Sequence, residues 1–219
     1  MLEIIRFVLG PVATNAYLIA DTDTSDAAVI DPAWDGHIIL AEAQKRGWKI
    51  NQIWYTHAHF DHIGGAAELA RALQPSPKVA LHPADLPLWA ARGGAPAFGF
   101  EIDPGPRPDV DLSKVRVLSV GAYRFNVRHA PGHSPGHCIF YCAEACTAQG
   151  RIEGVLFSGD LIFQRGVGRT DLPGGDWDAL LTSIQQHVYT LPDETRILSG
   201  HGEEATVGEE KCENPFIRA

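Results

Sequence analysis

The stretch Thr56-His57-Ala58-His59-Phe60-Asp61-His62 places three imidazoles and one carboxylate in one short segment. Further residues that can bind a metal follow along the chain: His133, Asp160 and His201. Neutral imidazole and carboxylate oxygen suit zinc, iron or manganese better than calcium or magnesium. Because seven such groups exceed what one tetrahedral ion can use, the sequence predicts two divalent ions, with zinc preferred and iron or manganese as alternatives. Two ions that share a water are typical of hydrolytic sites.

The residues around this segment indicate how it is positioned. A buried strand is expected over residues 50–56, and continued alternation would place His57 and His59 on one face. Ile63-Gly64-Gly65 supplies flexible backbone for the turn that follows. The three later candidates each lie in a glycine-containing turn next to apolar runs, where a pocket can form. The alternative, that these are ordinary polar residues of the surface or core, leaves the ligand types and their spacing unexplained.

Composition and charge limit the classes of function. A length of 219 residues fits one α/β domain covering residues 1–219, with ordinary hydrophobic (45%) and charged (21%) content. The net charge of −9 argues against nucleic acid as a partner, although two divalent ions would still allow an anionic substrate. No apolar run reaches membrane-spanning length, so no membrane is expected as a partner. The expected partner is a small-molecule substrate. The oligomeric state is not indicated.

Cysteine usage and the first residues suggest the compartment. The four cysteines form no C-x-x-C pair, so reduced thiols and a cytoplasmic protein are expected. The spacing of Cys138, Cys142 and Cys146 also allows a metal box, but a strand running into a turn would separate them. Glu3 and Arg6 interrupt the early apolar stretch, which favours a strand over a signal peptide.

Hydrophobic periodicity and turn residues predict alternating strands and helices. Strands are expected over residues 4–9, 16–20, 27–30, 50–56, 79–81, 115–120, 123–129, 139–142, 155–159 and 197–198. Helices are expected over residues 35–47, 66–73, 83–92 and 176–188, with Asp35 and Asp176 as caps of the first and last. The segment 93–108 is expected to be a loop and a candidate lid. This order suits an α/β fold of the four-layer αββα sandwich type, with the ligand loops at one edge.

The motifs resemble those of the metallo-beta-lactamase superfamily. Residues 56–62 are similar to its T-H-x-H-x-D-H signature. The later motifs, at residues 131–137, 158–160 and 200–202, follow in the order that the superfamily shows. Residues 159–163 and 166–171 are similar to the glyoxalase II (hydroxyacylglutathione hydrolase) branch, and residues 206–210 and 214–216 to its short bacterial members. The resemblance spans nearly the whole chain.

The resemblance implies a role for each ligand. One ion would be held by His57, His59 and His133, the other by Asp61, His62 and His201, and Asp160 would bridge both, with Asp61 and Asp160 as the catalytic residues. A hydroxide bridging the ions would then attack the carbonyl of S-lactoylglutathione or a related glutathione thioester. His137 is expected to support or pack against the ligands. Asp31 either orients a ligand histidine or forms a simple Asx turn.

Substrate binding is less defined by the sequence. The resemblance implies that Arg169 contacts the glutathione moiety, and Arg165 is a weaker candidate. The alternative for Arg169 is an ion pair with Asp171, which occupies a position that is aromatic in larger glyoxalase II enzymes. Those enzymes carry a C-terminal helical domain that contacts glutathione, and this sequence is expected to lack it because it ends at Ala219.

Other functions remain open. Persulfide dioxygenases that use one iron share much of residues 166–171, and also Arg165, but they tend to show His-Asp-Tyr where this chain has Gly200-His201-Gly202. β-Lactamases tend to lack the pattern of residues 166–171, and a nuclease would suit a basic surface better than this acidic one. A non-catalytic binding module is disfavoured, because open-sided metal sites serve catalysis.

Overall fold

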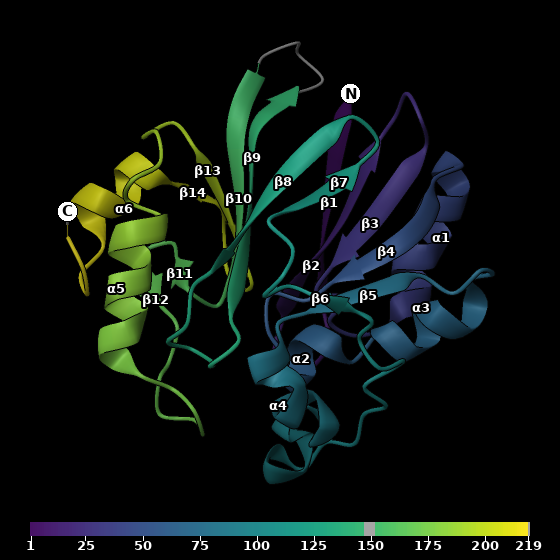
Figure 1. Cartoon of the computed structure of the whole chain (residues 1–219), viewed down its shortest axis with the longest axis horizontal. Coiled ribbons are helices and arrows are strands. Elements are labelled where there is room, and N and C mark those ends of the chain that lie inside the picture. Colours follow the sequence, from purple (N-terminus) through teal and green to yellow (C-terminus); the bar gives the residue numbers. More distant parts are fainter. Residues whose placement is uncertain (147–151, 219) are drawn as a thin grey trace.

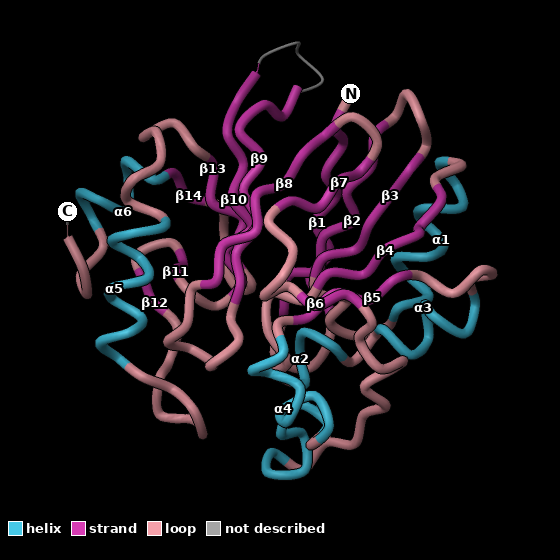
Figure 2. The backbone as a smooth tube through the Cα atoms, viewed as in Figure 1, coloured by secondary structure: helices cyan, strands magenta, loops and turns pink. Residues whose placement is uncertain are grey.

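Two six-stranded sheets lie face to face at the centre of the molecule, with helices on their outer faces (Figure 1). The computed structural model describes residues 1–146 and 152–218. Loops and the short helices α2 (Phe60–Ile63) and α4 (Leu86–Ala90) gather at the lower edge of the sheets in this view (Figure 2). The predicted αββα sandwich is confirmed.

The first sheet has the order β1-β2-β3-β4-β5-β6. Its strands are β1 (Leu2–Leu9), β2 (Thr14–Asp21), β3 (Asp26–Ile30), β4 (Lys49–Trp54), β5 (Lys78–Leu81) and β6 (Val110–Asp111). The first three strands pair antiparallel, and from β3 to β6 the neighbours are parallel. The carboxyl ends of β3 and β4 therefore lie at one edge, the usual place for ligand-binding residues in open α/β sheets.

The second sheet has the order β14-β13-β10-β9-β8-β7. Its strands are β7 (Val117–Val120), β8 (Tyr123–His129), β9 (Cys138–Cys146), β10 (Ile152–Gly159), β13 (Arg196–Ser199) and β14 (Ala205–Thr206). Because β10 and β13 are parallel, the residues that follow them emerge at the same edge. A separate hairpin of β11 (Ile162–Phe163) and β12 (Gly166–Val167) lies directly after β10 in the chain.

Helices cover the two outer faces. On the first sheet lie α1 (Gly36–Arg46) and α3 (Ala66–Ala72), and on the second lie α5 (Trp177–His187) and α6 (Val207–Glu213) (Figure 1). The Asp176 carboxylate accepts a hydrogen bond from the Ala179 backbone N–H and caps α5, as predicted. Asp35 makes no side-chain cap and adopts a left-handed φ of 48°, so the predicted cap of α1 is wrong. Among the described helices, none is long and apolar enough to cross a membrane.

Alternation along β10 connects two apolar cores. Val155 and Phe157 point into the core between the sheets, whereas Leu156 packs toward Ile184 of α5. The core between the sheets is rich in aromatic rings; Trp54, for example, packs edge-to-face on Phe125 with ring centroids 5.2 Å apart. This core fixes the ends of β4 and β10 against each other, which is where the candidate ligands begin.

Local structure differs from the prediction in the segments nearest the site. β4 ends at Trp54, so His57 and His59 lie in a loop and the predicted strand alternation is wrong. The segment expected to be a loop begins with η2 (Arg92–Phe98), which consists of short 3-10 turns interrupted at Gly93 and Gly94, whose φ values of 62° and 77° are not helical. The helix expected before it is divided into η1 (Pro83–Asp85) and α4. Glycine and proline do not prevent such short helical turns, which need few hydrogen bonds.

The cysteines follow their prediction only in part. β9 runs unbroken through Cys138, Cys142 and Cys146, so no turn separates these three residues. Cys138 and Cys142 are buried free thiols and Cys212 is an exposed one. Reduced thiols are thus what the structure has at these positions.

Candidate metal centre

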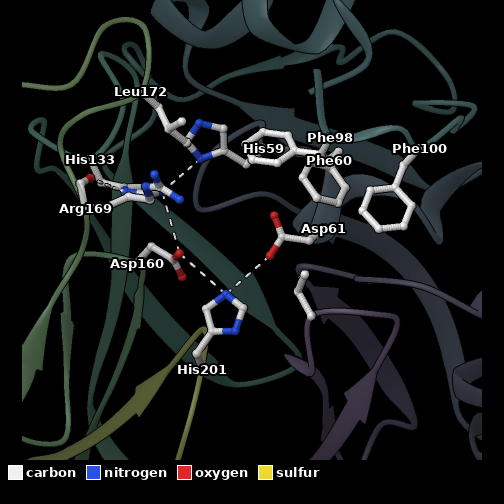
Figure 3. Close-up of a pocket in the computed structure, with 11 residues that line it drawn as sticks. His59, Phe60, Asp61, Phe98, Phe100, His133, Asp160, Arg169, Leu172 and His201 are labelled. Atoms are coloured by element: carbon white, nitrogen blue, oxygen red, sulfur yellow. Dashed lines mark hydrogen bonds and ion pairs between the residues drawn. The ribbon is translucent and has the colours of Figure 1, made fainter. Parts of the chain in front are cut away.

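The predicted ligands converge from separate segments on one pocket at the lower edge of the sheets. His57, His59, Asp61 and His62 come from the segment after β4, and His133 comes from the loop between β8 and β9. Asp160 directly follows β10, and His201 lies two residues beyond the end of β13. Figure 3 shows five of these side chains pointing toward one another: His59, Asp61, His133, Asp160 and His201.

One group consists of three imidazoles. The donor atoms of His57, His59 and His133 lie within 4.8 Å of one another. The closest pair is His59 Nδ1 and His133 Nε2, at 2.8 Å. All three side chains are buried, so a cation placed among them would be shielded from solvent. We call these residues the imidazole group.

A second group contains a carboxylate. Asp61, His62 and His201 also place their donor atoms within 4.8 Å of one another. Asp61 Oδ2 lies 3.3 Å from both His62 Nε2 and His201 Nε2. His201 is the most accessible member, with 29% of its side chain exposed, so this site is open on one side. We call these residues the carboxylate group.

Asp160 lies between the two groups. Its Oδ1 is 3.3 Å from His62 Nε2, and its Oδ2 is 3.6 Å from both His133 Nε2 and His201 Nε2. One carboxylate thus faces members of both groups, which is the position a bridging ligand needs. Close approach at this point depends on Gly200, because a Cβ there would lie 2.2 Å from Asp160 Oδ1.

Unsatisfied polar atoms show that the site fits metal ions. His57 Nε2, His62 Nε2 and Asp160 Oδ1 are buried and have no hydrogen-bond partner among the described residues. Buried polar atoms are rarely left without a partner, because desolvation then costs free energy that nothing offsets. All three belong to the predicted ligand set: His57 and His62 each lie within 4.8 Å of the other donors of their group, and Asp160 Oδ1 lies 3.3 Å from His62 Nε2, so divalent cations would satisfy them.

The second ring nitrogen of several ligands is held by the protein. His62 Nδ1 lies 3.0 Å from Asp31 Oδ2, and His133 Nδ1 lies 2.8 Å from the Arg169 carbonyl oxygen. Both acceptors require a proton on Nδ1, so in the neutral ring the lone pair is on Nε2, the atom that would bind a metal. His57 Nδ1 lies 3.0 Å from the Thr56 hydroxyl, which itself donates to Asp31. Asp31 therefore orients ligand histidines, one of the two predicted alternatives.

Burial and charge act differently on the two groups. Desolvation lowers the pKa of His57 well below its usual value and that of His59 to about 3, so both rings are neutral at pH 7. Burial also opposes charge on His62, but the adjacent Asp61 and Asp160 outweigh it and raise the pKa of His62 well above its usual value. The pKa of His201 is raised in the same way. The carboxylate group thus attracts positive charge, and a proton and a metal ion compete for it.

Asp85 is a residue that sequence reasoning missed. Its buried carboxylate accepts hydrogen bonds from the Ala58 N–H at 3.1 Å, the Ser134 hydroxyl at 2.7 Å and the Gly136 N–H at 2.6 Å. It therefore ties the segment of His57 and His59 to the loop of His133. No sequence signal marked it, because Asp85 is 27 and 49 positions from its partners Ala58 and Ser134 and lies within residues 83–92, which were expected to form a helix.

The loop of His201 is held by β2. The Thr14 hydroxyl donates to Asp61 Oδ2 at 2.8 Å, and Thr14 also forms an isolated β-bridge with His201. The Asn15 amide and the Tyr17 hydroxyl both donate to the Ser199 carbonyl oxygen. The two contacts to Ser199 join residues 184 and 182 positions apart in sequence, and the contact of Thr14 with Asp61 spans 47 positions, so they could not be read from the local pattern.

A third cluster of possible donors contributes orientation. Asp31, His57 and His62 also lie within ligand distance of one another. However, both Asp31 oxygens already accept hydrogen bonds from Thr56. His137 Nε2 accepts from the Asp160 backbone N–H at 3.1 Å, so His137 positions the bridging residue, in line with its predicted supporting role.

The two candidate substrate residues are placed differently. Arg169 lines the pocket, but its guanidinium forms two hydrogen bonds of 2.7 Å to Asp171. Arg165 pairs with Glu213 and is absent from the residues that line the pocket. The structure therefore brings Arg169 and not Arg165 to the site, with Arg169 already in the ion pair that was its predicted alternative.

Comparisons with known proteins agree with this architecture. The sequence pattern of the metallo-beta-lactamase superfamily matches residues 9–201. The chain is 35% identical over 216 residues to the probable metallo-hydrolase YqgX of Bacillus subtilis, covering 97% of this chain and 96% of that protein. It is 32% identical over 211 residues to the hydroxyacylglutathione hydrolase GloC of Haemophilus influenzae, covering 94% and 93%.

Solved structures are similar over nearly the full chain. BLEG-1, a B3 metallo-beta-lactamase, is 35% identical with a TM-score of 0.85, covering 99% of both chains. TTHA1623, solved in a di-iron-bound form, is 40% identical with a TM-score of 0.82, covering 97% of this chain and 100% of that one. The donor set of this chain therefore suits divalent metal ions, and a similar fold holds two irons.

Proposed function

Since this chain belongs to the metallo-beta-lactamase superfamily, we propose that it is a metal-dependent hydrolase that cleaves thioesters of a small thiol such as glutathione. The observation that carries the proposal is the position of Asp160, with one oxygen facing His62 and the other facing His133 and His201. Such a carboxylate suits a two-ion site with an open side. The likeness to GloC, a hydroxyacylglutathione hydrolase, supports the thioester class.

The residues fit a reaction in which water cleaves the bond between acyl carbon and sulfur. When bound, two divalent ions acidify a shared water and draw electron density from the carbonyl. The imidazole group would hold one ion, the carboxylate group the other, and Asp160 both. Water adds its oxygen to the acyl carbon and the bond to sulfur breaks. The products are a carboxylate, a thiol and one proton.

The protein itself supplies position and shielding. Asp31 and the Arg169 carbonyl fix the rings of His62 and His133, so their free nitrogens stay aimed at the pocket. Asp85 fixes the spacing of the loops that carry the imidazole group. We propose that catalysis depends on this rigid placement of the ligands, because ligand geometry must hold within a fraction of an ångström. No serine or cysteine nucleophile is needed.

Thiol release from S-lactoylglutathione tests the proposal. Metal-quantified protein should release thiol steadily, His59→Ala should release far less, and Arg165→Ala should match the wild type because Arg165 lies outside the pocket. Absence of release from S-lactoylglutathione and from other glutathione thioesters would overturn the proposal. So would a single iron per chain with oxygen uptake on glutathione persulfide, which would indicate the dioxygenase alternative.

A second candidate is β-lactam hydrolysis, which the likeness to BLEG-1 favours. Both substrates present an acyl carbon to water in an open pocket, so the same residues would serve. Parallel assays of a penicillin, a carbapenem and S-lactoylglutathione on one preparation decide between them. The thioester proposal expects a kcat/KM at least a hundredfold higher for the thioester.

A further inference from the structure

The pocket has an apolar side that the metal ligands do not explain. Its cavity of about 190 Å³ is lined by five of the candidate ligands, by Arg169, and by the apolar residues Val12, Phe60, Phe98, Phe100 and Leu172. Figure 3 shows the three phenylalanines on the side of Asp61, opposite Leu172 and Arg169. Val12 and Phe98 leave 42% and 46% of their surface exposed. Apolar side chains that gather exposed in a cavity usually mark a binding surface.

The rings on this side form one packed unit, which we call the aromatic wall (Phe60, Phe98 and Phe100). The Phe60 ring lies 5.4 Å from that of Phe98 and 5.3 Å from that of Phe100, measured between centroids. Trp34 packs edge-to-face on both Phe60 and Phe100 from behind. A surface of interlocked rings is pre-formed and loses little entropy when a ligand binds.

Backbone packing fixes the aromatic wall beside the ligands. Gly93, at a φ of 62°, lies so close to Phe60 that a Cβ would come within 2.3 Å of the Phe60 nitrogen. Phe60 is the residue between His59 and Asp61. The segment of residues 92–100 is therefore docked directly on the metal-binding loop, and Phe98 and Phe100 keep a fixed place relative to the ligands.

The opposite side of the pocket carries Leu172 and one charged residue, Arg169, whose charge is already paired. Two of the three guanidinium nitrogens of Arg169, Nε and Nη2, donate to Asp171 at 2.7 Å. A free guanidinium would attract a carboxylate of glutathione, and a paired one does so weakly. Charge on Arg169 therefore contributes little to binding of the thiol carrier. The main surface of the pocket that remains available to a substrate is apolar.

We propose that the aromatic wall binds the acyl group of the thioester, so that the preferred substrates carry an apolar acyl chain rather than the small, polar lactoyl group. This inference rests on the proposed thioester hydrolysis. The acyl group is assigned to the wall because common thiol carriers are polar, which suits the side of Arg169. Burial of one methylene corresponds to roughly a fourfold gain in binding, and a half-open wall gives about twofold.

An acyl series on one thiol tests the proposal. Glutathione thioesters from acetyl to octanoyl, with lactoyl beside them, should show kcat/KM rising about two- to fourfold per methylene until the cavity is filled. Phe98→Ala should reduce the octanoyl-to-acetyl ratio at least fivefold. Phe216→Ala removes a phenylalanine outside the pocket that is somewhat more exposed than Phe98 (55% against 46%) and should leave the ratio unchanged. A flat series, or lactoyl as the best substrate, would overturn the proposal.

A binding measurement separates this proposal from the proposed function. Calorimetric titration of the metal-loaded protein with S-alkyl glutathiones, which are thioethers and cannot be hydrolysed, should give affinity that rises with alkyl length, and Phe98→Ala should make the rise shallower. If no thioester is cleaved but this rise is seen, thioester hydrolysis fails and the apolar site stands. If thiol is released while affinity stays flat with alkyl length, the apolar site fails and the hydrolysis stands. Preference for apolar thiols over apolar acyl groups would also overturn the assignment.

Discussion

The imidazole group and the carboxylate group, the two candidate metal sites, differ in how burial and charge act on their side chains. His57, His59 and His133 are buried rings, two of them with pKa values pushed down by desolvation, so they are ready for a metal over a wide pH range. His62 and His201 have raised pKa values, because Asp61 and Asp160 attract a proton to them. A metal must displace that proton before it binds.

This difference shows how one edge of a fold can build two unequal sites. Desolvation favours the neutral imidazole, and carboxylates favour a positive charge of either kind. The imidazole group should therefore hold its ion more firmly, and the more exposed carboxylate group should lose its ion first.

The largest effect is expected from Asp160→Ala, because this residue faces both groups. Removing it should lower kcat/KM for a thioester by about a thousandfold, the factor that corresponds to about 4 kcal/mol of lost transition-state stabilisation. Metal analysis should show fewer than two ions per chain. A variant with full metal content and near-normal turnover would show that Asp160 bridges nothing.

Single ligands of the two groups should differ. His59→Ala should lower the affinity of the firmer site and reduce turnover by at least a hundredfold. His201→Ala should leave one ion per chain bound and reduce turnover less. Titration of both variants with a competing chelator measures the affinities directly. The ranking of the groups fails if His201→Ala loses the more tightly held ion.

The supporting residues give intermediate effects. Asp85→Asn keeps the shape but replaces one acceptor oxygen with a donor, so it should loosen the imidazole group and cost about tenfold to a hundredfold in metal affinity or activity. Thr14→Val removes the hydroxyl on Asp61 and should affect only the carboxylate group, by about tenfold. Equal losses at both sites in either variant would contradict this separation.

The smallest effect is the pH dependence of the metal-free protein. Protonation of His62 and His201 stabilises the fold, and this stability is fully present below about pH 6.5 and lost as the pH rises through their raised pKa values. His57 and His59 stay neutral in the fold but take up protons when unfolded, so stability also falls below about pH 6.5. Melting in chelator should peak near neutral pH, a few degrees above the values near pH 5 and 9. A steady rise from pH 7 to 9 would be inconsistent with these directions.

The sequence predicted the parts of the site that are local. The spacing of residues 56–62, and glycine beside His133, Asp160 and His201, indicated the ligands because metal chemistry restricts residue type. The sandwich followed from strand and helix periods. The strand was predicted to end at residue 56 but ends at Trp54, two residues earlier. Strand propensity does not indicate where the backbone leaves the sheet to form a site.

The parts that were missed depend on long-range packing. The partners of Asp85 are 27 to 51 positions away in the sequence, and Asp61, the partner of Thr14, is 47 positions away. Hydrophobic periodicity does not indicate such contacts. The aromatic wall was missed because residues 93–108 looked like a glycine- and proline-rich loop, while Phe98 and Phe100 gain a role only when Gly93 docks on Phe60. Arg165 looked like a pocket residue from its motif, but Glu213 draws it away.

Metal stoichiometry by titration is the most direct test of the two-group account. Metal-free wild type titrated with zinc or ferrous ion by calorimetry should show two equivalents per chain, with the first ion bound more tightly, and His201→Ala should show only that first, tight equivalent. A single equivalent in the wild type, or two equal ones that survive in His201→Ala, would contradict the claim that Asp160 joins two unequal sites.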